Sequence, residues 1–532
     1  MQVWIEDRKA VVSCIFSEKE IVKAVGNYKF NKVKKVWEFP MSSIISIIDN
    51  LKIESTDEVL HFYEVLKVQE SERKKQIQKA EKIKTGKFTS QYKSWDVCFS
   101  HQKQALALAT LFDSYFLAMD VGTGKSMTTI KLIEHWQVPA MIVAPLSILE
   151  SVWIAEIAKW SKLTVVNLWH NLKALDKNYD VYLINYEHFK KIKQLPGKIK
   201  YLICDESSKL KSYKSQITKK LLEYKDTMPH KLLLSGKPAP NSLLEYWSQA
   251  AFINSNLLGD NFFKFRNTYF YSTGYGGYIY QPFPSAREAI MNKVAEQAFF
   301  IKKEDCLDLP EQVFQIRLVE MDAVQQKAYD DMKKDNIMEF KDHVTLGSSE
   351  LAKIMKLRQI SGGFCITTEG NTVKISDTKL TELMNVLDEI ADDKQVLIWV
   401  QFHFEVHMIT EALKKAKKSY ATLYGDMKQK EKEQAIEDFK NKKVTYLVSH
   451  PKSGGMGLNL QQCSYCVWFS MSYSEEEFYQ ANNRIHRPGQ TNKCTYILLH
   501  AKRSIDIVIY KALLKKEKMT SVCLSLLKGN AL

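Results

Sequence analysis

The chain alternates short apolar runs with longer amphipathic segments, and this alternation constrains its fold more than any other feature. In the first half, each run has five residues or fewer and is bounded by turn residues; the runs are 115–119, 140–144, 181–184, 201–204 and 232–234. Short runs without polar alternation are typical of strands buried on both faces of a parallel sheet. Amphipathic segments such as 126–136 and 148–160 lie between them and predict crossover helices. The pattern predicts a doubly wound α/β fold.

A second series of the same kind begins near residue 396. Its apolar runs are 396–400, 420–423, 445–448, 466–469 and 495–499. Residues 242–300 and 321–359 interrupt the alternation and favour helices, and the first of them contains an aromatic and glycine-rich stretch at 262–283. We therefore expect two similar α/β lobes with helical insertions.

The first 66 residues read as a small α+β module. Apolar stretches at 3–5 and 11–16 predict a hairpin. Ser17, followed three residues later by Glu20, predicts a capping box for a helix over 18–25. A strand over 33–39 ends at Pro40. Residues 67–84 are almost entirely Lys, Glu, Gln and Arg, which is typical of a solvated helix or linker.

Length and composition limit the class of protein. A chain of 532 residues predicts roughly three to four domains of about 150 residues each. No apolar run approaches the roughly 18 residues that span a bilayer, and the first residues lack the basic and apolar regions of a secretory signal. The nine cysteines are odd in number and scattered, as expected of free thiols inside a cell. The formal net charge of +15 favours a polyanionic partner such as nucleic acid.

Gly122-Thr123-Gly124-Lys125-Ser126 lies between an apolar run and an amphipathic segment. In such a turn the backbone N–H groups of Gly122, Thr123 and Gly124 can face a phosphate, and the helix N-terminus adds partial positive charge. Lys125 can reach the β and γ phosphates, and the Ser126 hydroxyl can ligate Mg²⁺. Met119 occupies the place of the first glycine of the strict phosphate-loop pattern, so an ordinary glycine-rich turn is the alternative.

Asp205-Glu206 directly follows the apolar run 201–204. At the carboxyl end of a buried strand beside a phosphate loop, Asp205 can hold Mg²⁺ and Glu206 can polarise the attacking water. A solvated acidic turn would be the favoured explanation if the pair stood alone.

A third segment, Gln480 to Gln490, contains Arg484 and Arg487 three residues apart. On one turn of helix they share a face. They can then reach a γ-phosphate from the second lobe and stabilise the charge of the transition state. The alternative is a basic surface turn.

Together these segments resemble the Swi/Snf-type ATPases of helicase superfamily two, through most of residues 92–515. Residues 120–126 look like motif I, 143–146 like motif Ia, 185–187 like motif Ib, 205–208 like motif II and 234–241 like motif III. Residues 397–402 resemble motif IV, 453–460 motif V and 480–490 motif VI. Lys237 stands where the family commonly has Thr. Among these ATPases, the chain most resembles compact members of the phage or bacterial type.

The resemblance implies two RecA-like lobes with ATP and Mg²⁺ in the cleft between them and double-stranded DNA across both. It adds Gln102 as an adenine-reading residue, and Gly457 of motif V and Gln480 of motif VI as further ATP contacts. Backbone contacts with DNA depend on cations, so we expect them from Lys209, Lys211, Arg358 and Lys452.

The N-terminal module also resembles the HARP-type module of annealing helicases, through residues 28–30 and 34–40. A strand that presents Lys35 beside Trp37 can meet a DNA backbone and stack on a base. Alternatively, Trp37 fills the core of the module and the lysines are solvated.

These observations divide the chain into four parts: the module at 1–66, a charged linker helix at 67–91, lobe 1 at 92–310 with an insertion near 242–300, and lobe 2 at 311–532 with an insertion near 321–375. They predict a monomeric, DNA-dependent ATPase that translocates on double-stranded DNA and remodels branched DNA by annealing or fork regression. We expect it in the cytoplasm, at the nucleoid, or in the nucleus if the source is eukaryotic. A strand-separating helicase, a protein-displacing remodeller and a structural DNA-binding protein are the alternatives.

Overall fold

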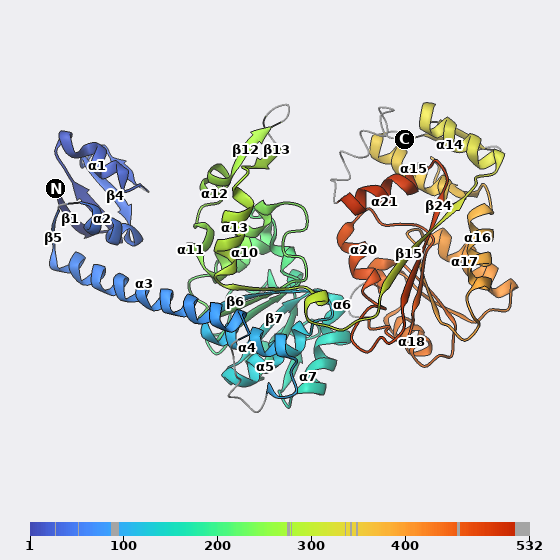
Figure 1. The fold of residues 1–532 in the computed structure, drawn as a ribbon, viewed down its shortest axis with the longest axis horizontal. Helices are drawn as coiled ribbons and strands as arrows, with labels where there is room; N and C mark the ends of the chain where they lie inside the picture. Colours follow the sequence, from blue (N-terminus) through green and yellow to red (C-terminus); the bar gives the residue numbers. More distant parts are fainter. Residues whose placement is uncertain are drawn as a thin grey trace. The chain divides into compact units, whose positions relative to one another are not determined.

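The computed structural model describes residues 1–26, 28–51, 53–86, 95–273, 277, 279–335, 337–340, 343–346, 349–454 and 458–515. The chain divides into two compact units, residues 1–91 and residues 92–532. Each unit, drawn in Figure 1, has its own hydrophobic core.

The first unit is a five-stranded sheet with short helices. The predicted hairpin is present, because β1 (Gln2–Glu6) and β2 (Lys9–Ser13) pair antiparallel. The strand order is β3-β4-β2-β1-β5, with β3 at Lys29–Asn31, β4 at Val36–Pro40 and β5 at Glu54–Ser55. Helices α1 (Lys19–Ala24) and α2 (Ile44–Asn50) contribute Val22, Ile44 and Ile47 to the core.

Two local expectations for this unit are corrected. The capping interaction lies two residues earlier than predicted, because the Glu18 carboxylate accepts from the Ile15 N–H and Ser17 lies within a 3₁₀ turn (Phe16–Glu18). The charged segment 67–84 forms the second part of one 28-residue helix, α3 (Asp57–Lys84), which begins at the N-cap Thr56. The break that we placed at 66/67 therefore falls inside a continuous helix.

Lobe 1 of the second unit is built on a seven-stranded sheet in which every described pairing is parallel. The order is β14-β6-β11-β10-β7-β9-β8. The strands are β6 (Ser114–Met119), β7 (Ala140–Ala144), β8 (Val165–Asn167), β9 (Val181–Asn185), β10 (Tyr201–Asp205), β11 (His230–Leu234) and β14 (Ala298–Ile301). All five apolar runs of the first series are strands of this sheet.

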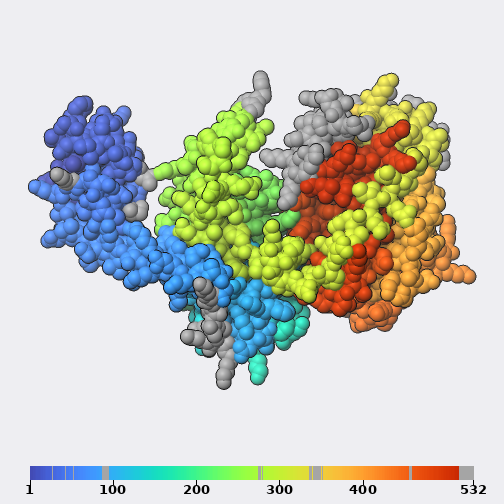
Figure 2. Space-filling view, viewed as in Figure 1, coloured from blue at the N-terminus to red at the C-terminus, as the bar shows by residue number. Residues whose placement is uncertain are grey.

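Helices cover this sheet on both sides. Helices α4 (Ser100–Leu111), α5 (Lys125–Trp136) and α7 (Ala155–Trp160) lie on one side, and the helices of the insertion lie on the other (Figure 1). The insertion contains α10 (Tyr246–Ile253), α11 (Ser255–Leu258), α12 (Phe262–Tyr269) and α13 (Ala286–Ala295). It also contains a hairpin, β12 (Phe270–Thr273) with β13 (Ile279–Pro282), which projects from the lobe (Figure 2).

Lobe 2 is built on a six-stranded sheet of order β15-β24-β23-β20-β22-β21, again parallel in every described pairing. The strands are β15 (Gln312–Val319), β20 (Val396–Trp399), β21 (Tyr420–Leu423), β22 (Tyr446–Ser449), β23 (Tyr465–Trp468) and β24 (Cys494–Ala501). Its helices are α14 (Ala323–Asp335), α15 (Glu350–Ser361), α16 (Thr378–Glu389), α17 (His403–Lys415), α18 (Gln429–Lys440), α19 (Pro451–Gly454), α20 (Glu475–Asn482) and α21 (Ile505–Lys515).

Alternate residues of the central strands of lobe 2 enter two separate cores. Leu397 and Trp399 of β20 pack with residues of α20 and α21, whereas Val396 and Ile398 pack with α16 and α17. Both faces of the sheet are therefore buried, as the unbroken apolar runs predicted. The fold is the expected pair of doubly wound lobes, and in the described part of the chain no helix is long and apolar enough to cross a bilayer.

Candidate nucleotide site between the two lobes

The glycine-rich segment forms a tight loop between β6 and α5. Gly122 and Gly124 have φ values of 85° and 88°, a region that glycine adopts without steric cost. Gly124 is the N-cap of α5, so the helix begins at Lys125, and Ser126 is its second, partly buried residue. The backbone N–H groups at this end of α5 lack partners within the helix and carry its positive dipole. This geometry suits a phosphate.

Gln102 packs directly on the loop. Its amide donates to the Thr123 carbonyl oxygen at 3.1 Å, and a Cβ on Gly124 would lie 1.9 Å from Gln102 Nε2. His101 Nε2 contacts the same carbonyl at 2.8 Å. Thr123 is itself buried and donates to the Asp120 carbonyl oxygen at 2.8 Å. The loop is thus held from α4 on one side.

The Lys125 ammonium points back into the loop. It donates to the carbonyl oxygens of Met119 at 2.9 Å and Asp120 at 3.1 Å. Burial lowers the pKa of Lys125, and the negative charges of Glu206, Asp205 and Asp120 oppose this shift. Because Glu206 and Asp205 act on this pKa, Lys125 lies near the acidic pair at the end of β10.

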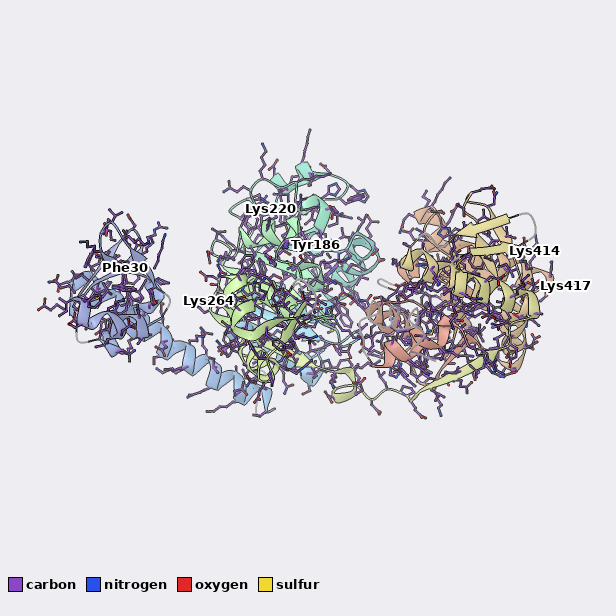
Figure 3. The ribbon with its side chains drawn as sticks, turned by 90° about the horizontal axis from the view of Figure 1, so that it is seen from above. Phe30, Tyr186, Lys220, Lys264, Lys414 and Lys417 are labelled. Carbon is purple, nitrogen blue, oxygen red and sulfur yellow. The ribbon has the colours of Figure 1, made fainter. Side chains whose placement is uncertain are left out.

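Asp205 is held at several atoms. Its Oδ2 accepts from the indole N–H of Trp153 at 3.0 Å, and its Oδ1 accepts from the N–H of Glu206 at 2.9 Å. The hydroxyl of Tyr186 donates to the main-chain oxygen of Asp205 at 2.6 Å, and Figure 3 shows Tyr186 inside lobe 1. Burial raises the pKa of Asp205, and the nearby Lys125 opposes that shift.

Glu206 adopts a left-handed backbone with φ 51° and ψ 55°. Burial raises the pKa of its carboxyl group, and the adjacent Asp205 raises it further. Lys125 and Arg484 exert the main opposing effects on this pKa. A residue of lobe 2 therefore lies within electrostatic range of this carboxylate.

Motif VI of lobe 2 reaches the loop itself. A Cβ on Gly122 would lie 3.5 Å from Pro488 Cδ and 3.7 Å from Arg487 Cγ, which are ordinary van der Waals distances. Arg487 Nε donates to the Asn483 carbonyl oxygen at 2.8 Å, and Arg484 Nη1 donates to the Leu458 carbonyl oxygen at 3.3 Å. Burial lowers the pKa of Arg487 to about 10 and that of Arg484 well below its usual value.

Other bonds join the lobes around this contact. The Tyr479 hydroxyl lies 2.6 and 2.5 Å from the two carboxylate oxygens of Asp120. Lys237 pairs with Glu475 at 2.8 Å and lies over the Tyr479 ring, 4.2 Å from its centroid. The buried Lys303 contacts Asn483 and, at 2.9 Å, His486 Nδ1. Residues of α20 and motif VI thus bind lobe 1 at three places.

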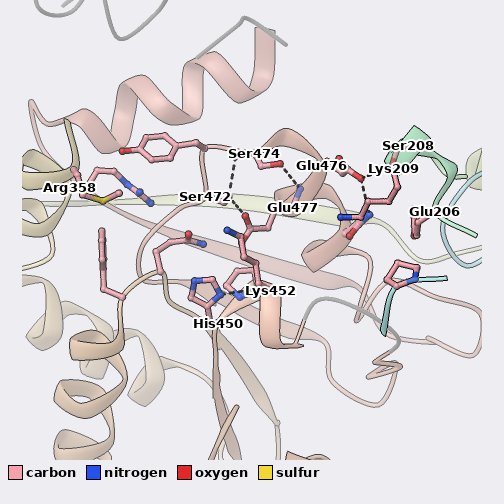
Figure 4. Close-up of a pocket in the computed structure, with 17 residues that line it drawn as sticks. Glu206, Ser208, Lys209, Arg358, His450, Lys452, Ser472, Ser474, Glu476 and Glu477 are labelled. Carbon is pink, nitrogen blue, oxygen red and sulfur yellow. Dashed lines mark hydrogen bonds between the residues drawn. The ribbon is translucent and has the colours of Figure 1, made fainter. Parts of the chain in front are cut away.

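A cavity of about 700 Å³ lies between the lobes beside this network (Figure 4). Glu206, Ser208 and Lys209 line it from lobe 1. Arg358, Lys452, Glu476 and Gln480 line it from lobe 2, and Ser208 Oγ lies 3.5 Å from Glu476. The cavity brings three of the predicted DNA contacts close to one predicted ATP contact.

These predicted cations differ in their freedom to bind a ligand. Lys209 and Lys452 are exposed. The Arg358 guanidinium is buried, donates to the Met471 carbonyl oxygen and lies 3.9 Å from the centroid of the Tyr473 ring, so it is already engaged. Lys211 is partly buried and does not line this cavity. Gly457 lies outside the described residues.

In the first unit, the expectation that Trp37 presents its ring to a base is wrong. Trp37 is 6% exposed and belongs to the core of the module. Tyr28 and Phe30 pack against it at centroid distances of 4.8 and 4.7 Å and are each 41% exposed (Phe30 is labelled in Figure 3). Lys35 is exposed in the turn before β4, with φ 56°.

Sequence reasoning missed several residues of the site, including Trp153, Tyr479, Lys303 and His101. His101 and Tyr479 immediately precede Gln102 and Gln480. Their position next to a predicted site residue is the sequence signal that could have identified them. Trp153 and Lys303 lie far from any predicted site residue in sequence and carry no such signal.

The fold and the site together define a class of protein: two α/β lobes with a phosphate-loop sequence where they meet. Family comparison gives a narrower result. The model described as SNF2-related domain matches residues 101–363, and the model described as helicase conserved C-terminal domain matches residues 378–489. The chain therefore contains an SNF2-related domain followed by a helicase conserved C-terminal domain, and its resemblance to the Swi/Snf-type ATPases is confirmed.

Individual relatives are distant. A putative protein of Acyrthosiphon pisum secondary endosymbiont phage 1 is 24% identical over 77% of this chain and 94% of its own length. An uncharacterized ATP-dependent helicase of Mycoplasma genitalium is 25% identical over 76% of this chain, and a nuclear protein of Saccharomyces cerevisiae is 26% identical over 75%. The chain spans only 40% and 32% of the lengths of these last two.

The similarity to solved structures is also distant. The Sulfolobus solfataricus SWI2/SNF2 ATPase core in complex with dsDNA is 21% identical, with a TM-score of 0.40, over 83% of this chain and 95% of the other.

Proposed function

We propose that the chain hydrolyses ATP where its two lobes meet. The observation that carries this proposal is the close approach of Gly122 to Arg487 and Pro488, whose side chains lie within van der Waals reach of a Cβ built at that glycine, because it brings the basic turn of lobe 2 to the phosphate loop of lobe 1. Gln102 contacts adenine, the loop N–H groups and Lys125 hold the phosphates, and Gln480 and Gly457 complete the site. Lys125 leaves the carbonyls of Met119 and Asp120 for the phosphates when ATP enters.

The donor set fits Mg²⁺. Ser126 and Asp205 offer hard oxygen ligands, and Mg²⁺ usually takes one or two such protein ligands together with substrate phosphates and water. In the described residues no group of three His, Cys, Asp or Glu side chains could hold a metal ion by itself, which agrees with a cation shared with the nucleotide. When bound, Mg²⁺ neutralises charge on the phosphates.

Glu206 and the two arginines carry the chemistry. The ionised Glu206 accepts a proton from the attacking water and orients that water toward the γ-phosphate. Arg484 and Arg487 donate to the phosphoryl oxygens as negative charge builds on them. Since the arginines come from lobe 2 and Lys125 from lobe 1, ATP ties the lobes together and product release frees them.

We further propose that this cycle moves the protein along double-stranded DNA. The SNF2-related domain, the net charge of +15 and the exposed Lys209 and Lys452 of the interlobe cavity support this proposal. Lys211 completes the proposed backbone contacts from outside this cavity, and Arg358 does so after it leaves the Met471 carbonyl oxygen. Cation contacts with phosphates are largely independent of base sequence, as translocation requires.

The first unit, residues 1–91, with its HARP-like sequence, gives the chain its preference for branched DNA, which it anneals or regresses. Lys35 and its neighbouring lysines, with the exposed rings of Tyr28 and Phe30, form the surface that supports this role.

The test is a phosphate-release assay with single-stranded, duplex, forked and four-way DNA. We expect duplex DNA to stimulate hydrolysis and branched DNA to stimulate it most. Lys125→Ala should abolish turnover, while the matched Lys103→Ala, which alters a partly exposed residue of α4, should not. DNA-stimulated hydrolysis by Lys125→Ala, or the absence of hydrolysis by wild type, would overturn the proposal.

The DNA products separate the alternatives. Strand annealing or fork regression supports the branched-DNA proposal. Unwinding of a fork that lacks complementary arms identifies a strand-separating helicase, and displacement of a bound protein without a change in DNA structure identifies a remodeller.

A further inference from the structure

Trp153 lies in an unusual turn that leads to the acidic pair. The segment Leu149–Ile154 is a π-helix, placed between the short α6 (Leu146–Ile148) and α7. A π turn has more residues than an α turn, so it changes the direction of its side chains relative to a continuous α-helix. Such turns are costly and are frequent at functional sites. Trp153 is 0% exposed, and its indole N–H reaches across to β10.

The indole does more than fill space. A phenyl ring would fill most of the same interior, but only the indole provides an N–H to Asp205 Oδ2, at 3.0 Å. The other oxygen accepts from the Glu206 N–H, so each oxygen of this carboxylate keeps one further acceptor position. These two bonds fix the rotation of the carboxylate.

We propose that Trp153 is a positioning residue that orients the Asp205 carboxylate toward Mg²⁺. This inference rests on the proposed function, in which Asp205 helps to hold the cation. Groups that orient a metal ligand affect metal affinity almost as strongly as the ligand itself, and their loss typically costs about 10- to 100-fold. The π turn is the structural device that brings the indole to the carboxylate.

Two variants of the full-length protein test the role of the N–H. Trp153→Phe removes the donor, and 3-benzothienylalanine incorporated at position 153 replaces the N–H with sulfur while keeping the shape of the ring. The second variant keeps the test decisive if the first does not fold. Trp247→Phe is the matched control, because it removes an indole bond to the Gly259 carbonyl oxygen elsewhere in lobe 1.

The measurement is the binding of a fluorescent, non-hydrolysable ATP analogue over a series of Mg²⁺ concentrations and in EDTA. Both variants at position 153 should need about tenfold more Mg²⁺ for half-maximal binding, with unchanged affinity in EDTA. Their kcat should approach that of wild type when Mg²⁺ is saturating. Trp247→Phe should match wild type in every respect.

A purely structural role for Trp153 predicts a different result. It would lower stability and weaken nucleotide binding equally at every Mg²⁺ concentration. A wild-type Mg²⁺ requirement in the benzothienyl variant overturns the inference alone. If wild type itself shows no Mg²⁺-dependent nucleotide binding, the proposed function falls instead.

Discussion

Glu206 combines a strained backbone with a perturbed carboxyl group. A left-handed conformation costs a non-glycine residue about 1 kcal/mol or more, and such residues cluster at sites where geometry matters more than stability. Burial and the charge of Asp205 raise its pKa. Both features follow from its position between the end of a buried strand and the facing lobe, so neither was visible in the motif itself.

The raised pKa predicts a dependence of hydrolysis on pH. Glu206 must be ionised to accept a proton, so kcat should fall as pH is lowered through this pKa and should be constant above it. Steady-state hydrolysis at saturating Mg²⁺ and DNA checks this expectation. Glu206→Gln should lower kcat strongly and remove the acidic limb; an acidic limb that persists in this variant would assign it to another group.

The two arginines of motif VI should differ from Lys125 in their effect. Arg487→Ala should lower kcat by about 10³-fold while nucleotide affinity stays close to that of wild type, since the guanidinium acts on charge that develops during the reaction. Rapid-quench hydrolysis and equilibrium binding measure the two quantities. Because Arg487 is partly buried, Arg487→Lys controls for the loss of its packing. Weakened binding with unchanged turnover would contradict the role.

The positions of individual side chains were harder to predict from the sequence than the positions of the motifs. The residues of motifs I, II and VI converge as expected, because each motif follows a strand or a turn that fixes its place. Trp37 was ambiguous, since an aromatic residue beside lysines fits a core as well as a stacking surface. Trp153 was not predictable, because its bond to Asp205 depends on a π turn that leaves no pattern in the sequence.

At the scale of elements, α20 connects the nucleotide site to the rest of lobe 2. It carries Glu475 and Tyr479 on its first turns and leads directly into Arg484. Lys237 of motif III binds Glu475, so the residue that departs from the family pattern has a partner in the facing lobe. This pairing joins motif III to the start of α20, the helix that leads into motif VI.

Reversal of this ion pair tests the connection. Lys237→Glu and Glu475→Lys should each lower DNA-stimulated kcat several-fold, because each places like charges 2.8 Å apart. The double variant should recover most of the loss. The pair Lys220 and Glu223, in which only the glutamate is exposed, is reversed in the same way as the control. Additive losses in the double variant would show that the two residues act independently.

Strands were predicted well where both faces are buried, as in β6, β7, β10 and β20. Several other strands were missed, including two that lie at sheet edges. β14 lies at the edge of its sheet and directly follows a helical insertion, which hid its short apolar run. β15 is also an edge strand, and its Phe314, Ile316 and Leu318 are 42%, 47% and 51% exposed, so its apolar alternation does not mark a buried face.

At the scale of the whole molecule, the first unit has a core of its own, formed around Val3, Val12, Trp37 and Phe39. Its compactness agrees with a separate function. The choice of branched DNA is therefore separable from ATP turnover in our proposal.

Deletion of residues 1–91 tests this separation. The remaining chain should keep hydrolysis stimulated by duplex DNA within a few-fold of wild type. It should lose the additional stimulation by forked and four-way DNA. Comparison of the four DNA substrates, with the thermal unfolding of both proteins measured, checks the expectation. An unchanged preference for branched DNA would place this selectivity in the lobes.

The bonds of Lys125 with its own loop have a consequence for the catalytic cycle. Its ammonium is already satisfied by two main-chain oxygens. An arriving triphosphate therefore exchanges one set of acceptors for another, and part of its affinity is offset by the bonds that it displaces. In the proposed cycle, the same carbonyls accept from Lys125 again when ADP leaves, which offsets part of the cost of releasing ADP. The proposed translocation gains from such weak retention, because product release must end one step before the next can begin.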